Sequence, residues 1–74
     1  MKQFYKRVCK NADNTLDMNN IQRYTIDEIG QEALAIDYIN KEDMITLAGM
    51  EEAQQYEMLS TVFEHNNELL IKEL

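Results

Sequence analysis

The stretch TIDEIGQEALAIDYINKEDMITLAGMEEAQQYE, from Thr25 to Glu57, decides the predicted fold because it holds the clearest helical pattern of the chain. Thr25 with Glu28 three residues later matches the T-x-x-E capping box of a helix start. The apolar residues that follow recur at helical spacing: Ile26, Ile29, Ala33 and Ile36. We therefore expect a helix that begins after Thr25 and runs to about residues 38–40.

A second helix start follows in the same stretch. Asn40 and Asp43 repeat the capping signal as N-x-x-D, and Gly49 is placed to end or bend the helix. The apolar side of this helix is formed by Met44, Ile45, Leu47 and Ala48. From Met50 to Leu74 the pattern stays helical, with a seam formed by Tyr56, Leu59, Phe63 and Leu70. Asn66 and Asn67 interrupt this seam, and we expect them to cap a last helical turn over residues 68–74.

Two structures fit the N-terminal segment MKQFYKRVCK, residues 1–10. Phe4 and Val8 pair at i, i+4, which favours a short basic helix. The same segment also suits a strand, which residues 21–26 would pair with as a hairpin. The stretch from 11 to 24, which overlaps the second of these strands, is rich in asparagine and aspartate and predicts a polar loop.

These patterns predict one small domain over residues 1–74. Proline is absent and only two glycines occur. The turn-forming residues that an all-β chain usually contains are therefore missing or scarce. We expect an all-α fold, a small bundle of three to four short helices. The alternative is an α+β fold with an N-terminal β-hairpin.

Negative charge is concentrated in the central stretch. Residues 26–57 hold nine acidic residues and one basic residue, a net charge of −8, while the rest of the chain nets +1. Glu28 and Glu32 lie at i, i+4, where like charges oppose a helix by a few tenths of a kcal/mol, roughly. No nearby basic residue in the sequence compensates this repulsion, which suggests that the acidic residues serve a function.

Length and cysteine content indicate how the domain is stabilised. A core of 74 residues is marginal on its own, and a single cysteine forms no internal disulfide, so we expect oligomerisation or partner binding to supplement it. The charged first ten residues predict no signal peptide, and the longest apolar run, four residues, predicts no membrane segment. We therefore expect a cytoplasmic protein.

No residue pattern predicts catalysis, a cofactor or a metal. Asp13, Asn14 and Asp17 lie in the polar loop but lack the glycine of a calcium loop. His65 with neighbouring glutamates is a poor ligand set for zinc, and Cys9 lacks a nearby base. A helix-turn-helix over residues 23–49 would carry the wrong charge to read DNA, so we expect no direct nucleic-acid binding.

The remaining hypothesis is binding. We expect a non-enzymatic protein that inhibits or modulates another protein, in particular a nucleic-acid-binding one, through an acidic helical face. Carboxylates at helical spacing imitate the phosphates that such proteins grip. In size and acidity the chain resembles the inhibitors that phages and mobile elements make against nucleic-acid enzymes. The expected partner-binding residues are Asp27, Glu28, Glu32, Asp37, Tyr38, Glu42, Asp43, Glu51 and Glu52. Tyr38 is the preferred exposed aromatic.

The alternative hypothesis is a structural role. A homo-oligomeric helical module, at its smallest a homodimer, would use acidity only for solubility. Its expected interface is the seam of Tyr56, Leu59, Phe63 and Leu70.

Overall fold

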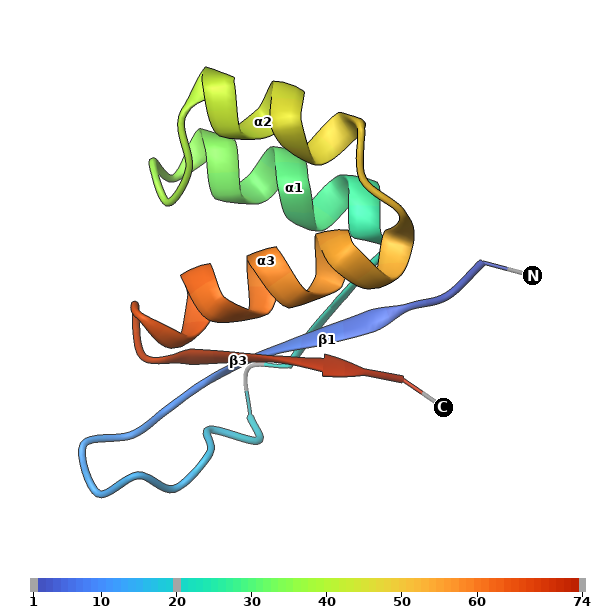
Figure 1. Ribbon diagram of the computed structural model, residues 1–74. Coiled ribbons are helices and arrows are strands. Elements are labelled where there is room, and N and C mark those ends of the chain that lie inside the picture. Colours follow the sequence, from blue (N-terminus) through green and yellow to red (C-terminus); the bar gives the residue numbers. More distant parts are fainter. Residues whose placement is uncertain (1, 20, 74) are drawn as a thin grey trace.

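The computed structural model describes residues 2–19 and 21–73, which form three helices on one side of a three-stranded sheet (Figure 1). Its elements are β1 (Tyr5–Cys9), β2 (Gln22–Tyr24), α1 (Ile26–Ala35), α2 (Lys41–Ala48), α3 (Glu52–Glu64) and β3 (Glu68–Lys72). The chain is therefore α+β. The expected all-α class, a helical bundle, is wrong, and the alternative with an N-terminal hairpin is right.

The sheet has the order β2-β1-β3, and both pairs of strands are antiparallel. Strand β1 lies in the centre, where Tyr5 pairs with Tyr24 on one side and with Lys72 on the other. Tyr5 and Val8 are both buried, although they face opposite sides of the sheet. The i, i+4 pair of Phe4 and Val8 that favoured a helix is equally compatible with a strand, because residues four apart lie on the same side of a sheet.

Helix α1 begins where the capping box predicts. The Thr25 side chain accepts a hydrogen bond from the Glu28 amide, and the Glu28 side chain accepts one from the Thr25 amide. The helix ends at Ala35, earlier than expected, in a Schellman motif: Asp37 adopts a left-handed conformation (φ 62°) and the Tyr38 amide donates to the Ala33 carbonyl.

Helices α2 and α3 agree more closely with the start and stop signals in the sequence. Asn40 and Asp43 form the predicted capping box of α2, and Gly49 is its C-cap residue. Helix α3 then begins at Glu52 and ends at Glu64. The last helical turn expected over 68–74 is wrong, because residues 68–72 form β3; Asn67 takes a left-handed conformation (φ 60°), which turns the chain back along β1. Residue 74 lies outside the described residues.

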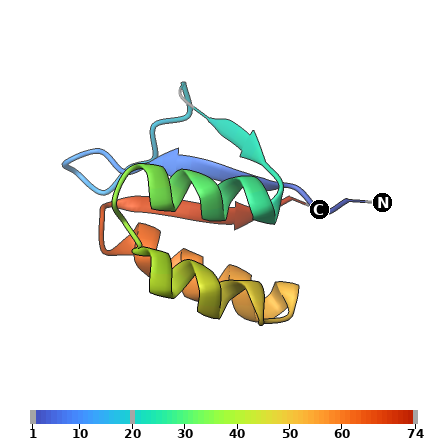
Figure 2. The ribbon, with the colours of Figure 1, turned by 90° about the horizontal axis from the view of Figure 1, so that it is seen from above.

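The core lies between the sheet and the helices. Its fully buried members include Ile29 of α1, Leu59 and Phe63 of α3, and Tyr5 of β1. The view from above shows α1 over the sheet, and Figure 1 places α2 farthest from it (Figures 1 and 2). A Cβ on Gly30 would come within 3.2 Å of the Leu47 side chain, so glycine permits the close approach of α1 and α2.

Candidate functional site

The nine expected partner-binding residues are placed over all three helices and their connections, and several have structural roles. Glu28 and Asp43 belong to capping boxes, and Glu51 is the N-cap residue of α3. Two others bind β1: Glu32 accepts from Arg7 at 3.3 Å, and Glu52 accepts from the Tyr5 hydroxyl at 3.0 Å. These contacts give the carboxylates partners that compensate their mutual repulsion, and the sequence did not reveal these partners.

The remaining members of the set differ in exposure. Asp27, Asp37 and Glu42 are exposed, and Asp37 occupies the left-handed position that ends α1. Tyr38 is half-buried: its ring meets Phe63 edge-on at 5.2 Å, and its hydroxyl donates to Glu68. The structure thus brings Tyr38 into a polar network rather than presenting it to solvent.

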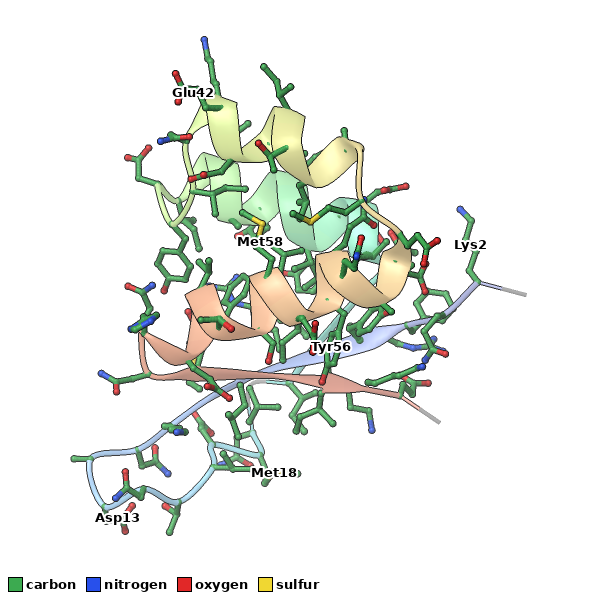
Figure 3. All side chains as sticks on the ribbon, in the orientation of Figure 1. Lys2, Asp13, Met18, Glu42, Tyr56 and Met58 are labelled. Carbon is green, nitrogen blue, oxygen red and sulfur yellow. The ribbon has the colours of Figure 1, made fainter. Side chains whose placement is uncertain are left out.

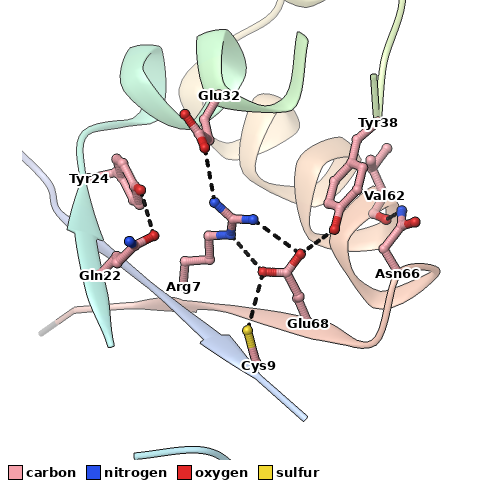
Figure 4. Close-up of polar contacts among 9 residues, drawn as sticks. All are labelled: Arg7, Cys9, Gln22, Tyr24, Glu32, Tyr38, Val62, Asn66 and Glu68. Carbon is pink, nitrogen blue, oxygen red and sulfur yellow. Dashed lines mark hydrogen bonds and ion pairs between the residues drawn. The ribbon is translucent and has the colours of Figure 1, made fainter. Parts of the chain in front are cut away.

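This network centres on the buried carboxylate of Glu68, which is 4% exposed (Figure 4). Arg7 donates to both of its oxygens, from Nε to Oε1 at 2.6 Å and from Nη2 to Oε2 at 3.3 Å. Tyr38 donates to Oε2, and the Cys9 thiol lies 3.7 Å from Oε1. Because Arg7 also binds Glu32, the network joins β1, β3, α1 and the α1–α2 connection.

The network shifts the pKa values of its own members. Burial alone would raise the pKa of Glu68, but hydrogen bonds from Arg7 and Tyr38 outweigh it and lower that pKa. Burial, followed by the charge of Glu68, raises the pKa of the Cys9 thiol, which therefore stays protonated and weakly nucleophilic. The only histidine, His65, lies exposed at the end of α3, and no three potential ligand residues gather as a metal site within residues 2–19 and 21–73.

The expected oligomer interface lies inside the single chain. Leu59 and Phe63 are fully buried and Leu70 is 3% exposed, all within the core. Tyr56 stacks on Tyr5 at 5.1 Å between ring centroids and donates its hydroxyl to the Leu70 carbonyl. Leu70 belongs to β3 itself, and the other three residues of the seam lie on α3, which packs against the sheet.

An exposed apolar surface lies instead on α1 and α2. It is lined by Leu34, Met44, Ile45 and Ala48, with Lys41 at its edge, and is called here the α1–α2 apolar surface. Ile45 is 76% exposed, the highest value among the exposed large hydrophobic residues of the described ranges. Four apolar residues among the eight of α2 are normal for a helix with one buried side, so the sequence carried no separate signal for this surface.

The second exposed surface is the side of the sheet that faces away from the helices. Alternation along the strands places on it Phe4, Lys6, Lys10, Arg23, Leu69, Ile71 and Glu73, and the adjoining residues Met18 and Ile21 extend it. Val8 lies on the same side of the sheet but is only 1% exposed, so this surface does not include it. We call this set the outer sheet face. Met18, Ile21 and Ile71 are 64%, 37% and 39% exposed, and Figure 3 shows Met18 on the side opposite the helices. Arg23 lies 3.9 Å over the Phe4 ring and pairs with Glu73 at 2.9 Å.

Comparisons with known proteins identify no relative: no family model, curated protein or solved structure matches the chain. Among the described residues, no helix combines the length and apolar character needed to span a bilayer.

Proposed function

We propose that the chain is a small, non-enzymatic interaction module of the cytoplasm that associates with further copies of itself through the α1–α2 apolar surface. The observation that carries this proposal is the 76% exposure of Ile45 within a surface that also includes Leu34, Met44 and Ala48. Contiguous exposed apolar side chains of this kind are typical of interaction sites.

Burial of this surface also addresses the small size of the core. Covering an exposed isoleucine contributes about 1.5 to 3 kcal/mol, which is substantial for a domain of this size. In this proposal most of the carboxylates serve helix capping, the Arg7 network and solubility. The capping roles of Glu28 and Asp43 support that assignment.

The test compares two lysine variants of α2 by sedimentation velocity over a range of concentrations. Ile45→Lys should reduce association by about tenfold or more, because it places a charge at the centre of the interface. Thr46→Lys introduces the same charge at the next exposed residue and should associate more nearly as the parent does. Circular dichroism checks that both variants fold. Equal association of Ile45→Lys and the parent would overturn the proposal.

A second candidate function is docking on a basic partner, in the manner of a nucleic-acid mimic. The observation that favours it is charge: residues 26–64 contain ten acidic residues and one basic residue, and Asp27, Glu42 and Glu57 among them are exposed. Reversal of these three to lysine should abolish capture of a partner from a cell extract, and added DNA or RNA should compete with the parent protein. Capture that survives the reversal and is indifferent to nucleic acid would exclude mimicry.

A further inference from the structure

We infer that self-association is head to tail, with the α1–α2 apolar surface of one copy docked on the outer sheet face of the next. This inference rests on the proposed self-association and adds its geometry. It commits to a second copy as the occupant of both surfaces. Charge decides between the two arrangements that use the α1–α2 apolar surface, the symmetric one and the head-to-tail one.

The first argument is electrostatic. The segment from α1 to α2, residues 26–48, contains six acidic residues and one basic residue, a net charge of −5. The outer sheet face carries Lys6, Lys10 and Arg23 against Glu73, a net charge of +2. A symmetric contact between two α1–α2 surfaces would bring two strongly negative segments together, whereas a head-to-tail contact brings opposite charges together.

The second argument is the distribution of exposed apolar side chains. Ile45 belongs to the α1–α2 apolar surface, and Met18, Ile21 and Ile71 belong to the outer sheet face. Each surface therefore offers apolar area that water covers in the single chain, and each is flanked by charge of opposite sign to the other. A head-to-tail contact buries both surfaces, while a symmetric α1–α2 contact would leave the sheet residues exposed.

The geometry of such a contact has a consequence for size. Because the two surfaces are different parts of the molecule, each copy that binds one neighbour retains a free surface for another. A heterologous contact of this kind forms either closed rings or open chains, rather than a dimer alone. The average mass should therefore rise with concentration beyond that of a dimer.

Complementation between two variants tests the inference. Ile45→Lys disables the α1–α2 apolar surface, because a cation there would oppose the basic sheet face. Ile71→Glu disables the outer sheet face, and the new carboxylate lies opposite Lys6, its cross-strand neighbour, which favours retention of the fold. Each variant alone should remain a monomer, while an equimolar mixture should form one heterodimer, in which the intact surface of each variant meets the intact surface of the other.

The outcomes separate the two proposals. If the parent protein is a monomer throughout, the proposed self-association fails and this inference fails with it. If Ile71→Glu associates as the parent does and the mixture with Ile45→Lys gains nothing, self-association stands but the contact is symmetric, which overturns the inference. Circular dichroism and urea melts of both variants establish that a monomer is a folded one, and Ile71→Thr provides a second variant if Ile71→Glu does not fold.

Discussion

Two arginine–glutamate pairs lie on opposite sides of the same sheet, and they share most of their chemistry. Arg7 pairs with Glu68 and lies 5.3 Å from the Phe63 centroid; Arg23 pairs with Glu73 and lies 3.9 Å from the Phe4 centroid. Their burial differs. The side chains of the first pair are 15% and 5% exposed, and those of the second are 56% and 27% exposed.

This difference in burial shows that the same kind of ion pair has a different role on each side of the sheet. Beneath the helices, a charge must be paired because water is excluded, so the Arg7–Glu68 pair fixes the relative positions of β1, β3 and α1. On the outer sheet face, water still reaches Arg23 and Glu73, so their attraction contributes little to folding. The charges there are available to a partner.

The largest expected contrast is between the two phenylalanines. Phe63→Ala removes a fully buried ring and should destabilise the fold by about 3 to 5 kcal/mol, enough to unfold much of a domain this small. Phe4→Ala removes a half-buried ring of the outer sheet face and should cost about 1 kcal/mol. Urea denaturation measures both. Similar midpoints for the two variants would contradict the difference between the two sides of the sheet.

The arginines should show the next largest contrast. Arg7→Met leaves the Glu68 carboxylate buried without its main partner, and we expect a loss of about 3 kcal/mol. Arg23→Met breaks the exposed pair and should cost between about 0 and 1 kcal/mol. Urea melts of the double variant Arg7→Met/Glu68→Leu provide the control, since removing both charges should recover part of the loss. A loss for Arg23→Met that equals that for Arg7→Met would refute this assignment.

The pH dependence of stability should be a smaller effect of the same pair. Contacts with Arg7 and Tyr38 lower the pKa of Glu68 below its usual value of 4.5. A lowered pKa in the folded state means that the stabilisation is complete above the unfolded pKa and is lost as the pH falls through the folded pKa. The unfolding free energy should therefore fall below about pH 4.5 in the parent and fall less steeply in Glu68→Gln. Urea melts at several acidic pH values decide it, with Glu73→Gln as the matched variant from the exposed pair; parallel profiles for Glu68→Gln and the parent would count against the role of Glu68.

Local signals in the sequence predicted the helices of this fold well. The capping boxes at Thr25 and Asn40 and the stop at Gly49 are all confirmed, because each depends on contacts within one turn of helix. The hairpin of residues 5–9 with 22–24 was foreseen only as the alternative, since a central strand buried on both sides loses its two-residue alternation.

The features that escaped prediction depend on distant partners. Strand β3 pairs with β1 across about sixty residues of chain, and this pairing overrides the helical pattern of the C-terminal segment. The Arg7–Glu68 contact spans 61 residues in the same way, and neither residue stands out locally. For the same reason the sequence indicated that the seam of Leu59, Phe63 and Leu70 was available to bind a second copy. These residues are instead buried in the core of the single chain.

The central claim is that opposite charges on the two exposed surfaces bring copies of the chain together, and salt tests it most directly. Sedimentation velocity of the unmodified protein should be measured as the salt concentration rises from about 0.1 M to about 1 M, which shortens the Debye length from about 10 Å to about 3 Å. A head-to-tail contact predicts association at the lower salt concentration that weakens at the higher one. Association that strengthens with salt would indicate that like-charged surfaces meet, and it would contradict this account.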